Sequence, residues 1–446
     1  MKNNKINILN SVIEQNLCVG CGACLYDISK SKMSWNNEGF LIPTAENLED
    51  LKGEQLIKVC PFNTFPDDKV KTENELTEIF LQDAPNFHHK AGKYFSTYAG
   101  FSEQFRLTSS SGGIATFLLS ELFEQKLIDA VITVGEGENE HYEYKLIKNK
   151  DELLSTSKTK YYPVSLAETL QKLKDFDGKV AVVGIGCFIK SIRLLQYYYP
   201  ELQKKIVFTI GIICGGLKSK FFAEYLAGKA GIKNNVFSKP QFRIKDHKST
   251  AGDYSFGCLD KFGTKKQIKM RTIGDMWGTG MFKCNACDFC DDVTTELADI
   301  SLGDAWLQPY NLDGKGTNVI ISRSILAEKI IKMGTEKRSI QVEKLPIERF
   351  LVSQQGSFNH RHKGLKYRIK KAKNKNQLIP PKRHDNENIT LYFKWVQKQR
   401  MKVRKRSLKV WSKKKNTQHF DKKMFYLLFM LKNQTRLYHL LKKFKI

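Results

Sequence analysis

The cysteines are the residues of this sequence best suited to chemistry. In "LCVGCGACLYDIS", the spacing of Cys18, Cys21 and Cys24 is C-x2-C-x2-C. Runs of this kind hold iron–sulfur clusters in bacterial ferredoxins, where a fourth Cys, followed by Pro, comes after three more residues. Ile28 stands at that position here. The fourth ligand must therefore come from a distant segment.

The pair Cys60-Pro61 in "VCPF" can supply this ligand. In two-cluster ferredoxins, the final Cys of each run binds the other cluster. This chain lacks the first three cysteines of a second run and the final Cys of the first, so one site is missing as a whole. We interpret the remaining residues as one complete 4Fe-4S ligand set: Cys18, Cys21, Cys24 and Cys60. A zinc site with four cysteines is the alternative, although such sites usually show paired C-x2-C spacing.

A second group with the same spacing occurs in "FKCNACDFCDD": Cys284, Cys287 and Cys290. No Cys follows, so a fourth ligand must lie upstream, at Cys187, Cys214 or Cys258. Apolar, β-branched runs precede Cys187 and Cys214, and strand ends of an α/β sheet are common ligand sites. We expect one of these two to complete a second 4Fe-4S site. Alternatively, the upstream cysteines are small buried apolar residues.

A turn in "TSSSGGIATFLL" is suited to binding an anion, and it consists of Ser110, Ser111, Gly112 and Gly113. It precedes a predicted amphipathic helix at residues 114–124. Backbone N–H groups of such a turn, together with the positive end of the helix dipole, can hold the phosphates of a nucleotide cofactor. An ordinary helix cap would show the same residue types.

Two further loops are suited to a flavin. "SKTKYYPV" contains Lys158 and Lys160, which could contact phosphates or could simply belong to a solvated loop. Gly184 and Gly186 in "VVGIGCFIK" follow a predicted strand, where the pyrophosphate or the ring of FAD could bind.

The elements that must position these residues alternate between strands and helices. The patterns predict helices at residues 114–124 and 166–174, and strands at residues 130–134, 180–185, 206–213 and 317–322. This alternation favours an α/β fold with a mostly parallel sheet. The expected domains are a ferredoxin-like 4Fe-4S domain (1–75), two parts of a flavin-binding α/β core (90–200 and 201–360) and a basic helical tail (361–446).

The composition indicates a globular protein without a membrane-spanning segment. The chain has 446 residues, of which 41% are hydrophobic, so several domains can be built. We find no apolar stretch of about 18 residues and no signal-peptide core, and we expect a cytoplasmic protein. Ten cysteines in a reducing compartment favour metal ligands or redox groups over disulfides.

The positive charge is concentrated at the C-terminal end. Residues 361–446 contain 28 Lys and Arg and 3 acidic residues, a net charge of +25 out of +28 for the whole chain. The final segment mixes cations with large apolar side chains, a pattern typical of an amphipathic helix at an anionic membrane surface. The protein could then be peripheral at the inner membrane face. A solvated extension is an equal alternative, and nucleic-acid binding is less favoured. Residues 377–388 have the composition of a linker.

Seven motifs, taken together, resemble a known family. They are "LCVGCGACLYDISKSKMSWNNEGFLIP", "TSSSGGIATFLL", "SKTKYYPV", "VVGIGCFIKSIRLL", "GIICGGLKSKFF", "CNACDFCDDVTTELADISLGDAWLQPY" and "FNHRHKGLKYRI". In the same order they resemble the coenzyme F420 hydrogenase/dehydrogenase beta-subunit family, over residues 15–370. The resemblance implies a flavoprotein module with iron–sulfur clusters, in which the Ser110–Gly113 turn, Lys160 and the Gly184–Cys187 loop belong to the flavin region.

The sequence thus predicts an iron–sulfur flavoprotein oxidoreductase. A ferredoxin-like donor would supply electrons, two 4Fe-4S clusters would relay them, and FAD would exchange them with a small-molecule substrate such as a deazaflavin or a surface-polysaccharide-related metabolite. No residue can be singled out as catalytic. The alternative is a non-catalytic metal-binding scaffold or electron-transfer subunit, whose basic tail would bind a membrane surface or nucleic acid.

Overall fold

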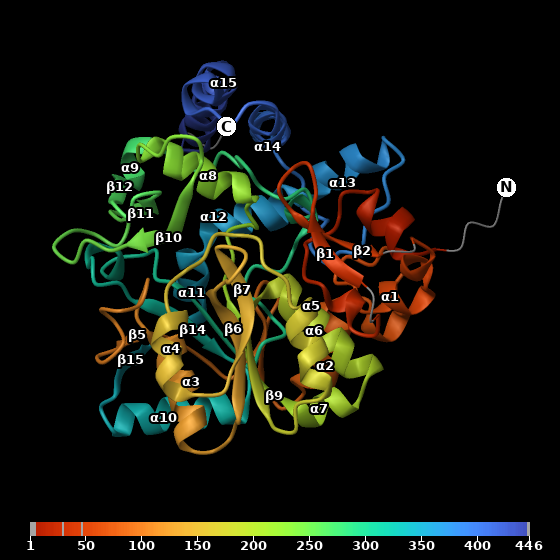
Figure 1. The fold of residues 1–446 in the computed structure, drawn as a ribbon, viewed down its shortest axis with the longest axis vertical. Helices are drawn as coiled ribbons and strands as arrows, with labels where there is room; N and C mark the ends of the chain where they lie inside the picture. The colour runs from red at the N-terminus through yellow and green to blue at the C-terminus, as the bar shows by residue number, and fades with distance from the viewer. Residues whose placement is uncertain (1–5, 29–30, 46–47, 444–446) are drawn as a thin grey trace.

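The centre of the molecule is a mixed eight-stranded sheet with the strand order β15-β5-β14-β13-β9-β8-β6-β7 (Figure 1). The computed structural model describes residues 6–28, 31–45 and 48–443. The strands of the sheet are β5 (Ser96–Ser102), β6 (Ala130–Glu136), β7 (Tyr142–Ile147), β8 (Val180–Ile185), β9 (Ile206–Ile212), β13 (Ile300–Asp304), β14 (Asn318–Ser322) and β15 (Ile340–Lys344). The four central strands β6, β8, β9 and β13 are parallel, and the outer ones pair antiparallel. The predicted α/β class is confirmed, but the expectation of a mostly parallel sheet is wrong, because four of the seven strand pairings are antiparallel.

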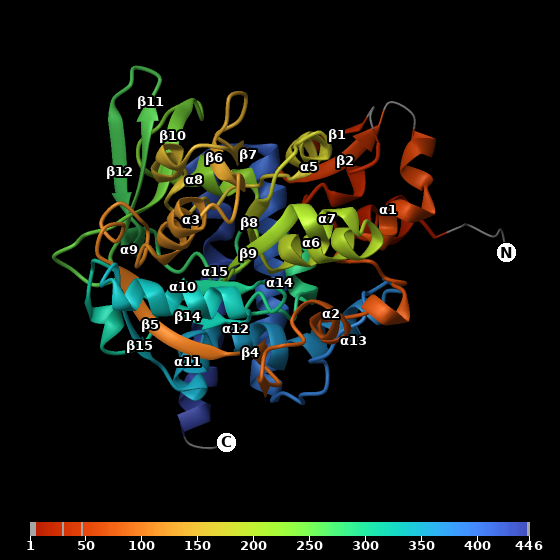
Figure 2. The same cartoon turned by 90° about the horizontal axis from the view of Figure 1, so that it is seen from below.

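Helices cover both faces of this sheet (Figure 2). One face packs on α3 (Ile114–Glu124) and α10 (Ile325–Glu336). The other face packs on α5 (Ala167–Lys174), α6 (Gly186–Tyr198) and α7 (Glu201–Lys205). Because both faces are covered, the parallel strands are apolar on both sides, which is why they read as continuous hydrophobic runs.

The N-terminal residues form a small module that packs against α5 and α6. It contains β1 (Ser31–Trp35), β2 (Leu41–Ala45), α1 (Glu54–Lys58) and α2 (Glu73–Phe80). The N–H of Leu166 donates to the carbonyl of Cys21 (2.8 Å). Gly22 allows this contact, because its φ is +79° and an added Cβ would lie 2.8 Å from the Cβ of Ala167.

A second sheet of three strands flanks the core, with α8 packed beside it. It consists of β10 (Phe237–Ile244), β11 (Ser255–Asp260) and β12 (Lys265–Lys269), next to α8 (Lys220–Lys229). The remaining short elements are β3 (Asn86–His88), β4 (Gly92–Tyr94), α4 (Leu153–Thr156), α9 (Met270–Ile273), α11 (Ile347–Ser353) and α12 (Gln355–Phe358).

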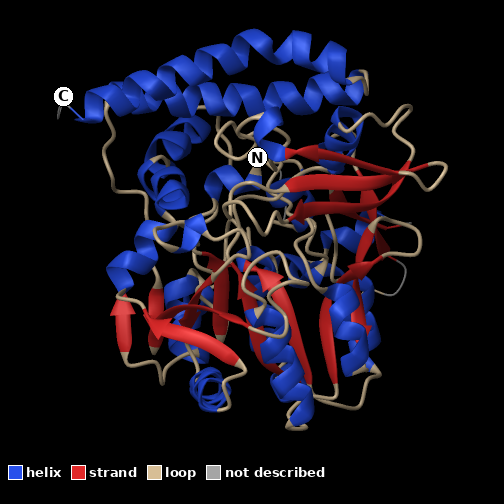
Figure 3. Cartoon of the chain, turned by 90° about the vertical axis from the view of Figure 1, so that its left-hand side faces the viewer, coloured by secondary structure: helices blue, strands red, loops and turns tan. Residues whose placement is uncertain are grey.

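The basic tail is helical, as predicted, and it packs on the body of the protein. It consists of α13 (Leu365–Lys373) and a hairpin of α14 (Leu391–Lys413) and α15 (Thr417–Lys443), the two long helices that lie side by side at one end of the molecule (Figure 3). Trp411 is fully buried against Phe282, and its indole N–H donates to Glu224 of α8 (2.8 Å). Within the described ranges, no helix is sufficiently long and apolar to span a bilayer.

The prediction that residues 377–388 form a linker is wrong, because two of its cations are buried in ion pairs. Arg383 pairs with Glu296 (2.7 Å) and Glu73 (3.4 Å), and Lys382 pairs with Asp291 (3.3 Å). All five side chains are at most 7% exposed. The polar composition reflects a buried charge network that ties the tail to the body.

Candidate functional site

Two strand ends bring Cys187 and Cys214 to one edge of the central sheet. The parallel neighbours β8 and β9 end at Ile185 and Ile212, and each Cys follows two residues later. Carboxyl ends of parallel strands lie at the same edge of a sheet, which is the usual ligand-binding edge of α/β folds. Cys187 is in the first turn of α6, and Cys214 is in the loop after β9.

Four thiols gather at this edge: those of Cys187, Cys214, Cys287 and Cys290. Burial raises the pKa of Cys187 well above its usual range, and the three other thiols raise it further. Burial likewise raises the pKa of Cys214, and Cys287 contributes to that rise. Both upstream candidates from the sequence therefore lie beside the second cysteine group.

Backbone N–H groups and one guanidinium point at these sulfurs. The N–H of Gly216 donates to Cys214 Sγ and that of Leu217 donates to Cys287 Sγ, each at 3.2 Å. Arg361 is 4% exposed and donates to the carbonyl oxygen of Cys214. Burial opposes the charge of Arg361, but the neighbouring thiols raise its pKa above the usual value. These donors favour the thiolate form and oppose the effect of burial on the Cys214 thiol.

The predicted N-terminal set also comes together, with Cys18, Cys21, Cys24 and Cys60 in one group. Burial raises the pKa of Cys24 well above its usual range, and the three other thiols raise it further. The N–H of Gly20 donates to Cys18 Sγ (3.4 Å). Burial raises the pKa of Cys18 to about 12. The segment that contains Cys60 thus folds back onto the first C-x2-C-x2-C run.

Cys284 occupies a position between the two groups. Its Sγ lies 3.5 Å from the carbonyl oxygen of Cys18, and its thiol is hydrogen-bonded to Cys287. That hydrogen bond, together with burial, raises the pKa of Cys284 well above the usual range, whereas it lowers the pKa of Cys287 to about 6. The first residue of the second C-x2-C-x2-C run therefore lies between the groups, hydrogen-bonded to Cys287 and close to the backbone of Cys18.

Cys258 lies apart from both groups. It is buried in β11, where burial and Asp260 raise its pKa to about 11. Among the described residues, no three His, Cys, Asp or Glu side chains gather closely enough to hold a single metal ion.

The Ser110–Gly113 turn lies at the same edge of the sheet, between β5 and α3. Ser110 Oγ accepts from the N–H of Thr159 (2.8 Å), which brings Lys160 beside the turn. Of the hydrogen bonds in the described ranges, none is donated by the main-chain N–H groups of residues 110–113. The geometry at Gly112 also reflects packing, since an added Cβ would lie 2.6 Å from the carbonyl oxygen of Gly100.

Two lysines beside the turn donate to carbonyl oxygens. Lys160 Nζ donates to the carbonyls of Thr156 and Ser157, the latter at 2.8 Å. Lys245, the residue after β10, donates from Nζ to the carbonyls of Ser111 (3.1 Å) and of residues 106 and 315. Burial lowers the pKa of Lys160 to about 7 and that of Lys245 to about 8. In the part of the chain that the structure describes, neither ammonium forms an ion pair with a carboxylate.

Gly184 and Gly186 have close-packed surroundings. A Cβ on Gly184 would lie 3.3 Å from Cβ of Phe188, and one on Gly186 would lie 2.5 Å from Oδ2 of Asp292. Gly186 thus allows the start of α6 to approach the 290–296 loop, which brings Cys187 toward the second group. The Gly184–Gly186 loop therefore helps to place Cys187, and its role in flavin binding stays a prediction.

Two arginines at this edge of the sheet, Arg243 and Arg361, were not predicted from the sequence. Arg243 of β10 forms an ion pair with Asp304 and lies 5.5 Å from the ring of Trp306, which is 41% exposed. Arg361 also went unassigned, although it lies in the motif "FNHRHKGLKYRI". Its two separate carbonyl contacts come from loops far away in sequence, so no local pattern could have revealed them.

Comparison with known families identifies the core of the molecule. Residues 97–171 match the N-terminal part, and residues 177–348 the C-terminal part, of the coenzyme F420 hydrogenase/dehydrogenase beta subunit. The chain belongs to this beta-subunit family. Membership supports a redox role, as an enzyme or as a redox subunit. The matches include both strand ends and the second cysteine group, whereas the N-terminal module precedes them.

The curated relatives of this chain include three proteins from methanogens. The coenzyme F420-dependent sulfite reductase of Methanocaldococcus jannaschii is 24% identical over 403 residues, which cover 86% of this chain and 54% of that protein. One component of the F(420)H(2) dehydrogenase of Methanosarcina mazei is 24% identical over 238 residues, or 53% of this chain and 62% of that component. The coenzyme F420 hydrogenase beta subunit of Methanosarcina barkeri is 24% identical over 231 residues, which cover 48% of this chain and 71% of that protein.

This family member thus spans only 54% and 62% of the lengths of the first two relatives. Among solved structures, a chain of the F420-reducing [NiFe] hydrogenase complex from Methanosarcina barkeri has a TM-score of 0.49 and 19% identity. The similarity covers 66% of this chain and 97% of that chain.

Proposed function

We propose that the protein is an iron–sulfur flavoprotein oxidoreductase with two 4Fe-4S clusters and FAD. The observation that carries this proposal is the contact between two groups of four thiols, one of which lies at the ligand-binding edge of the sheet. Cys284 links the groups, because it is hydrogen-bonded to Cys287 of one group and its Sγ lies 3.5 Å from the carbonyl oxygen of Cys18 of the other. Cofactors held by the two groups would be close enough to exchange electrons directly.

The donor sets suit clusters. The first set is that predicted from the sequence: Cys18, Cys21, Cys24 and Cys60. For the second set we propose Cys187, Cys214, Cys287 and Cys290, because Cys187 interacts with the three other thiols, while the Sγ of Cys284 lies 3.5 Å from the carbonyl oxygen of Cys18. An iron–sulfur cube spaces its thiolates more widely than a single zinc ion does, and hydrogen bonds to the sulfurs tune its potential.

Residues beside the Ser110–Gly113 turn suit an anionic cofactor. The main-chain N–H groups of the turn and the ammonium groups of Lys160 and Lys245 would hold the pyrophosphate of FAD. Beside them, Tyr161 lies in an aromatic group in which its ring centroid is 4.6 Å from that of Trp277. These rings would exclude water from the cofactor.

In this proposal the protein binds the cofactors, orients their ligands and balances their charge. Arg361 would offset the negative charge of the second thiolate group, and the N–H groups of Gly216 and Leu217 would orient its sulfurs. When bound, the clusters would supply one-electron relay and the flavin would supply hydride exchange. The relatives named for coenzyme F420 favour a deazaflavin as the substrate class.

The test is anaerobic reconstitution of the full chain with iron, sulfide and FAD. We expect about eight iron atoms per chain and one bound flavin, with broad visible absorbance. The second measurement is the absorbance of a reduced deazaflavin mixed with the loaded protein, which reports whether the protein oxidises it. A protein that retains neither iron nor flavin would contradict the proposal, and a colourless zinc protein would favour a structural scaffold.

A further inference from the structure

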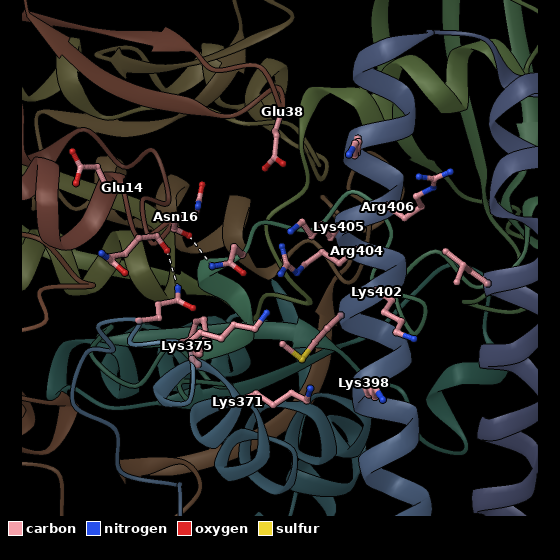
Figure 4. Close-up of a pocket in the computed structure, with 18 residues that line it drawn as sticks. Glu14, Asn16, Glu38, Lys371, Lys375, Lys398, Lys402, Arg404, Lys405 and Arg406 are labelled. Atoms are coloured by element: carbon pink, nitrogen blue, oxygen red, sulfur yellow. Dashed lines mark hydrogen bonds between the residues drawn. The ribbon is translucent and has the colours of Figure 1, made fainter.

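A basic groove lies between the C-terminal helices and the N-terminal module (Figure 4). Its volume is about 700 Å³. Six of its lysines come from two helices: Lys371 and Lys375 from α13 and the turn after it, and Lys398, Lys402, Lys405 and Lys409 from α14. Of the described residues that line it, only Glu14 and Glu38, on the opposite wall, carry carboxylates (Figure 4). The groove therefore attracts negatively charged groups.

The four lysines of α14 form one exposed face of the helix. Their spacing of four, three and four residues corresponds to successive turns on one side. The opposite side, with Val396, Val403 and Trp411, is buried. No ion pair of the described residues involves Lys398, Lys402, Lys405 or Lys409. Folding does not require four unpaired cations on this face, so the face is available for an external partner.

The floor of the groove reaches the two cysteine groups. Asn285 Nδ2 donates to the carbonyl oxygen of Asn16 (3.1 Å), and both residues line the groove. Asn285 follows Cys284, and Asn16 precedes Cys18 by two residues. The lysine face thus borders the point at which the two groups of thiols meet.

We propose that this groove is the docking site of an acidic one-electron carrier protein. The proposal rests on the proposed function, because it assumes that the neighbouring cysteines hold clusters. A reduced carrier would lose one electron and become oxidised, the cluster held by Cys18, Cys21, Cys24 and Cys60 would gain that electron, and no bond or proton would change. Positive charge around the entry point would steer the carrier to it.

The alternatives fit this groove less well. A flat bilayer would not enter a concave surface, and the exposed aromatic residues of the hairpin, Phe425, Tyr426 and Phe429, lie on α15 and do not line the groove. Nucleic acid would match the charge, but it would not explain why the lysines border the cysteine groups. Binding of a membrane or a nucleic acid would therefore depend on other residues of the tail.

The experiment compares two triple variants of the reconstituted full chain. The groove variant is Lys398→Glu, Lys402→Glu and Lys405→Glu. The control variant, Lys422→Glu, Lys423→Glu and Lys432→Glu, makes the same charge change at exposed positions of α15 outside the groove. Calorimetric titration with an acidic bacterial ferredoxin gives the Kd, and stopped-flow absorbance gives the rate at which the reduced ferredoxin is oxidised.

We expect the groove variant to weaken ferredoxin binding at least about tenfold and the control variant to change it less than about twofold. Binding by the unmodified chain should weaken with added salt. Equal losses in both variants, or no binding by the unmodified chain, would overturn the proposal. Greater affinity for anionic vesicles or for single-stranded DNA, lost in the groove variant, would also overturn it.

Iron content, flavin content and reduction by dithionite separate this inference from the proposed function. The groove variant should match the unmodified chain in all three. If the chain holds its cofactors and accepts electrons from dithionite but does not bind the ferredoxin, only the docking proposal fails. If no cofactors are retained, the proposed function fails first.

Discussion

The Sγ of Cys284 lies 3.5 Å from the carbonyl oxygen of Cys18, although 266 residues separate them in the sequence. This contact joins the N-terminal module to the loop after α9. It also sets Cys284 apart within the second C-x2-C-x2-C run: Cys287 and Cys290 lie beside Cys187 at the strand ends, whereas Cys284 contacts both Cys287 and the backbone of Cys18. The proposed ligand sets and their proximity both depend on this relationship.

Single cysteine variants should separate ligands from other cysteines. We expect Cys187→Ser and Cys214→Ser each to reduce the iron content of the reconstituted protein from about eight to about four atoms per chain. Cys258→Ser should leave it unchanged, because this thiol is buried in β11 away from both groups. Iron analysis and visible absorbance measure the effect, and equal iron in all three variants would contradict the second site.

Cys284→Ser tests the division of the second run. If Cys284 is not a ligand, the variant should retain about eight iron atoms, whereas Cys287→Ser should retain about four. The redox potential of one cluster should shift in Cys284→Ser, since the thiol contacts Cys18. If Cys284→Ser loses as much iron as Cys287→Ser, Cys284 is a ligand together with Cys287 and Cys290, as the C-x2-C-x2-C spacing predicts.

Arg383 should be important for stability. Replacing it by Met would leave the carboxylate of Glu296 buried without its ion-pair partner, which typically costs about 3–5 kcal/mol, whereas Glu73 would keep its pair with Lys190 (3.1 Å). The free energy of unfolding in urea measures the loss. As the control, Lys150→Met breaks an exposed ion pair with Glu124 and should cost less than about 1 kcal/mol. Similar losses in the two variants would contradict a role for the buried network.

Flavin binding should depend on pH through Lys160. Burial lowers the pKa of Lys160 to about 7, with Glu136 raising it and Lys158 lowering it. Below this pH the ammonium attracts phosphate, and above it the amine is neutral. Affinity for FAD should therefore fall as pH rises from about 6 to about 9, by at most about tenfold per pH unit.

Fluorescence titration of FAD across this range is the measurement. Lys160→Gln should bind FAD more weakly at low pH and should show a smaller dependence on pH. Lys158→Gln is the matched control, because Lys158 is exposed in the same loop. A flat pH profile for the unmodified chain would remove Lys160 from the phosphate site.

Gly186→Ala should disturb the junction between α6 and the second cysteine group. Its Cβ would lie 2.5 Å from the Asp292 carboxylate, so one of the two segments must shift, at a cost of about 1–3 kcal/mol. We expect lower thermal stability and less iron. Gly356→Ala, which meets nothing within 4 Å, should have little effect on either. Unchanged iron and stability in Gly186→Ala would show that this close approach is dispensable.

Local pattern was enough for the elements of the core. The helix predicted at residues 114–124 is α3, and the strand predicted at residues 180–185 is β8. These segments are long or strongly apolar, and buried parallel strands have no polar face to obscure them. The linker prediction for residues 377–388 failed for the opposite reason, since Lys382 and Arg383 look solvated until their buried partners are known.

The sequence by itself determined the α/β class, the family, the basic helical tail and the cysteines that could hold metal. These features depend on periodicity, spacing and composition, which are local. Only the tertiary structure decided which thiols meet: Cys187 and Cys214 lie beside Cys287 and Cys290, and Cys284 lies near the carbonyl oxygen of Cys18. It also decided that the lysines of α14 border the cysteine groups. Side chains hundreds of residues apart become neighbours only through the packing of helices and strands, and spacing along the chain carries no information about that distance.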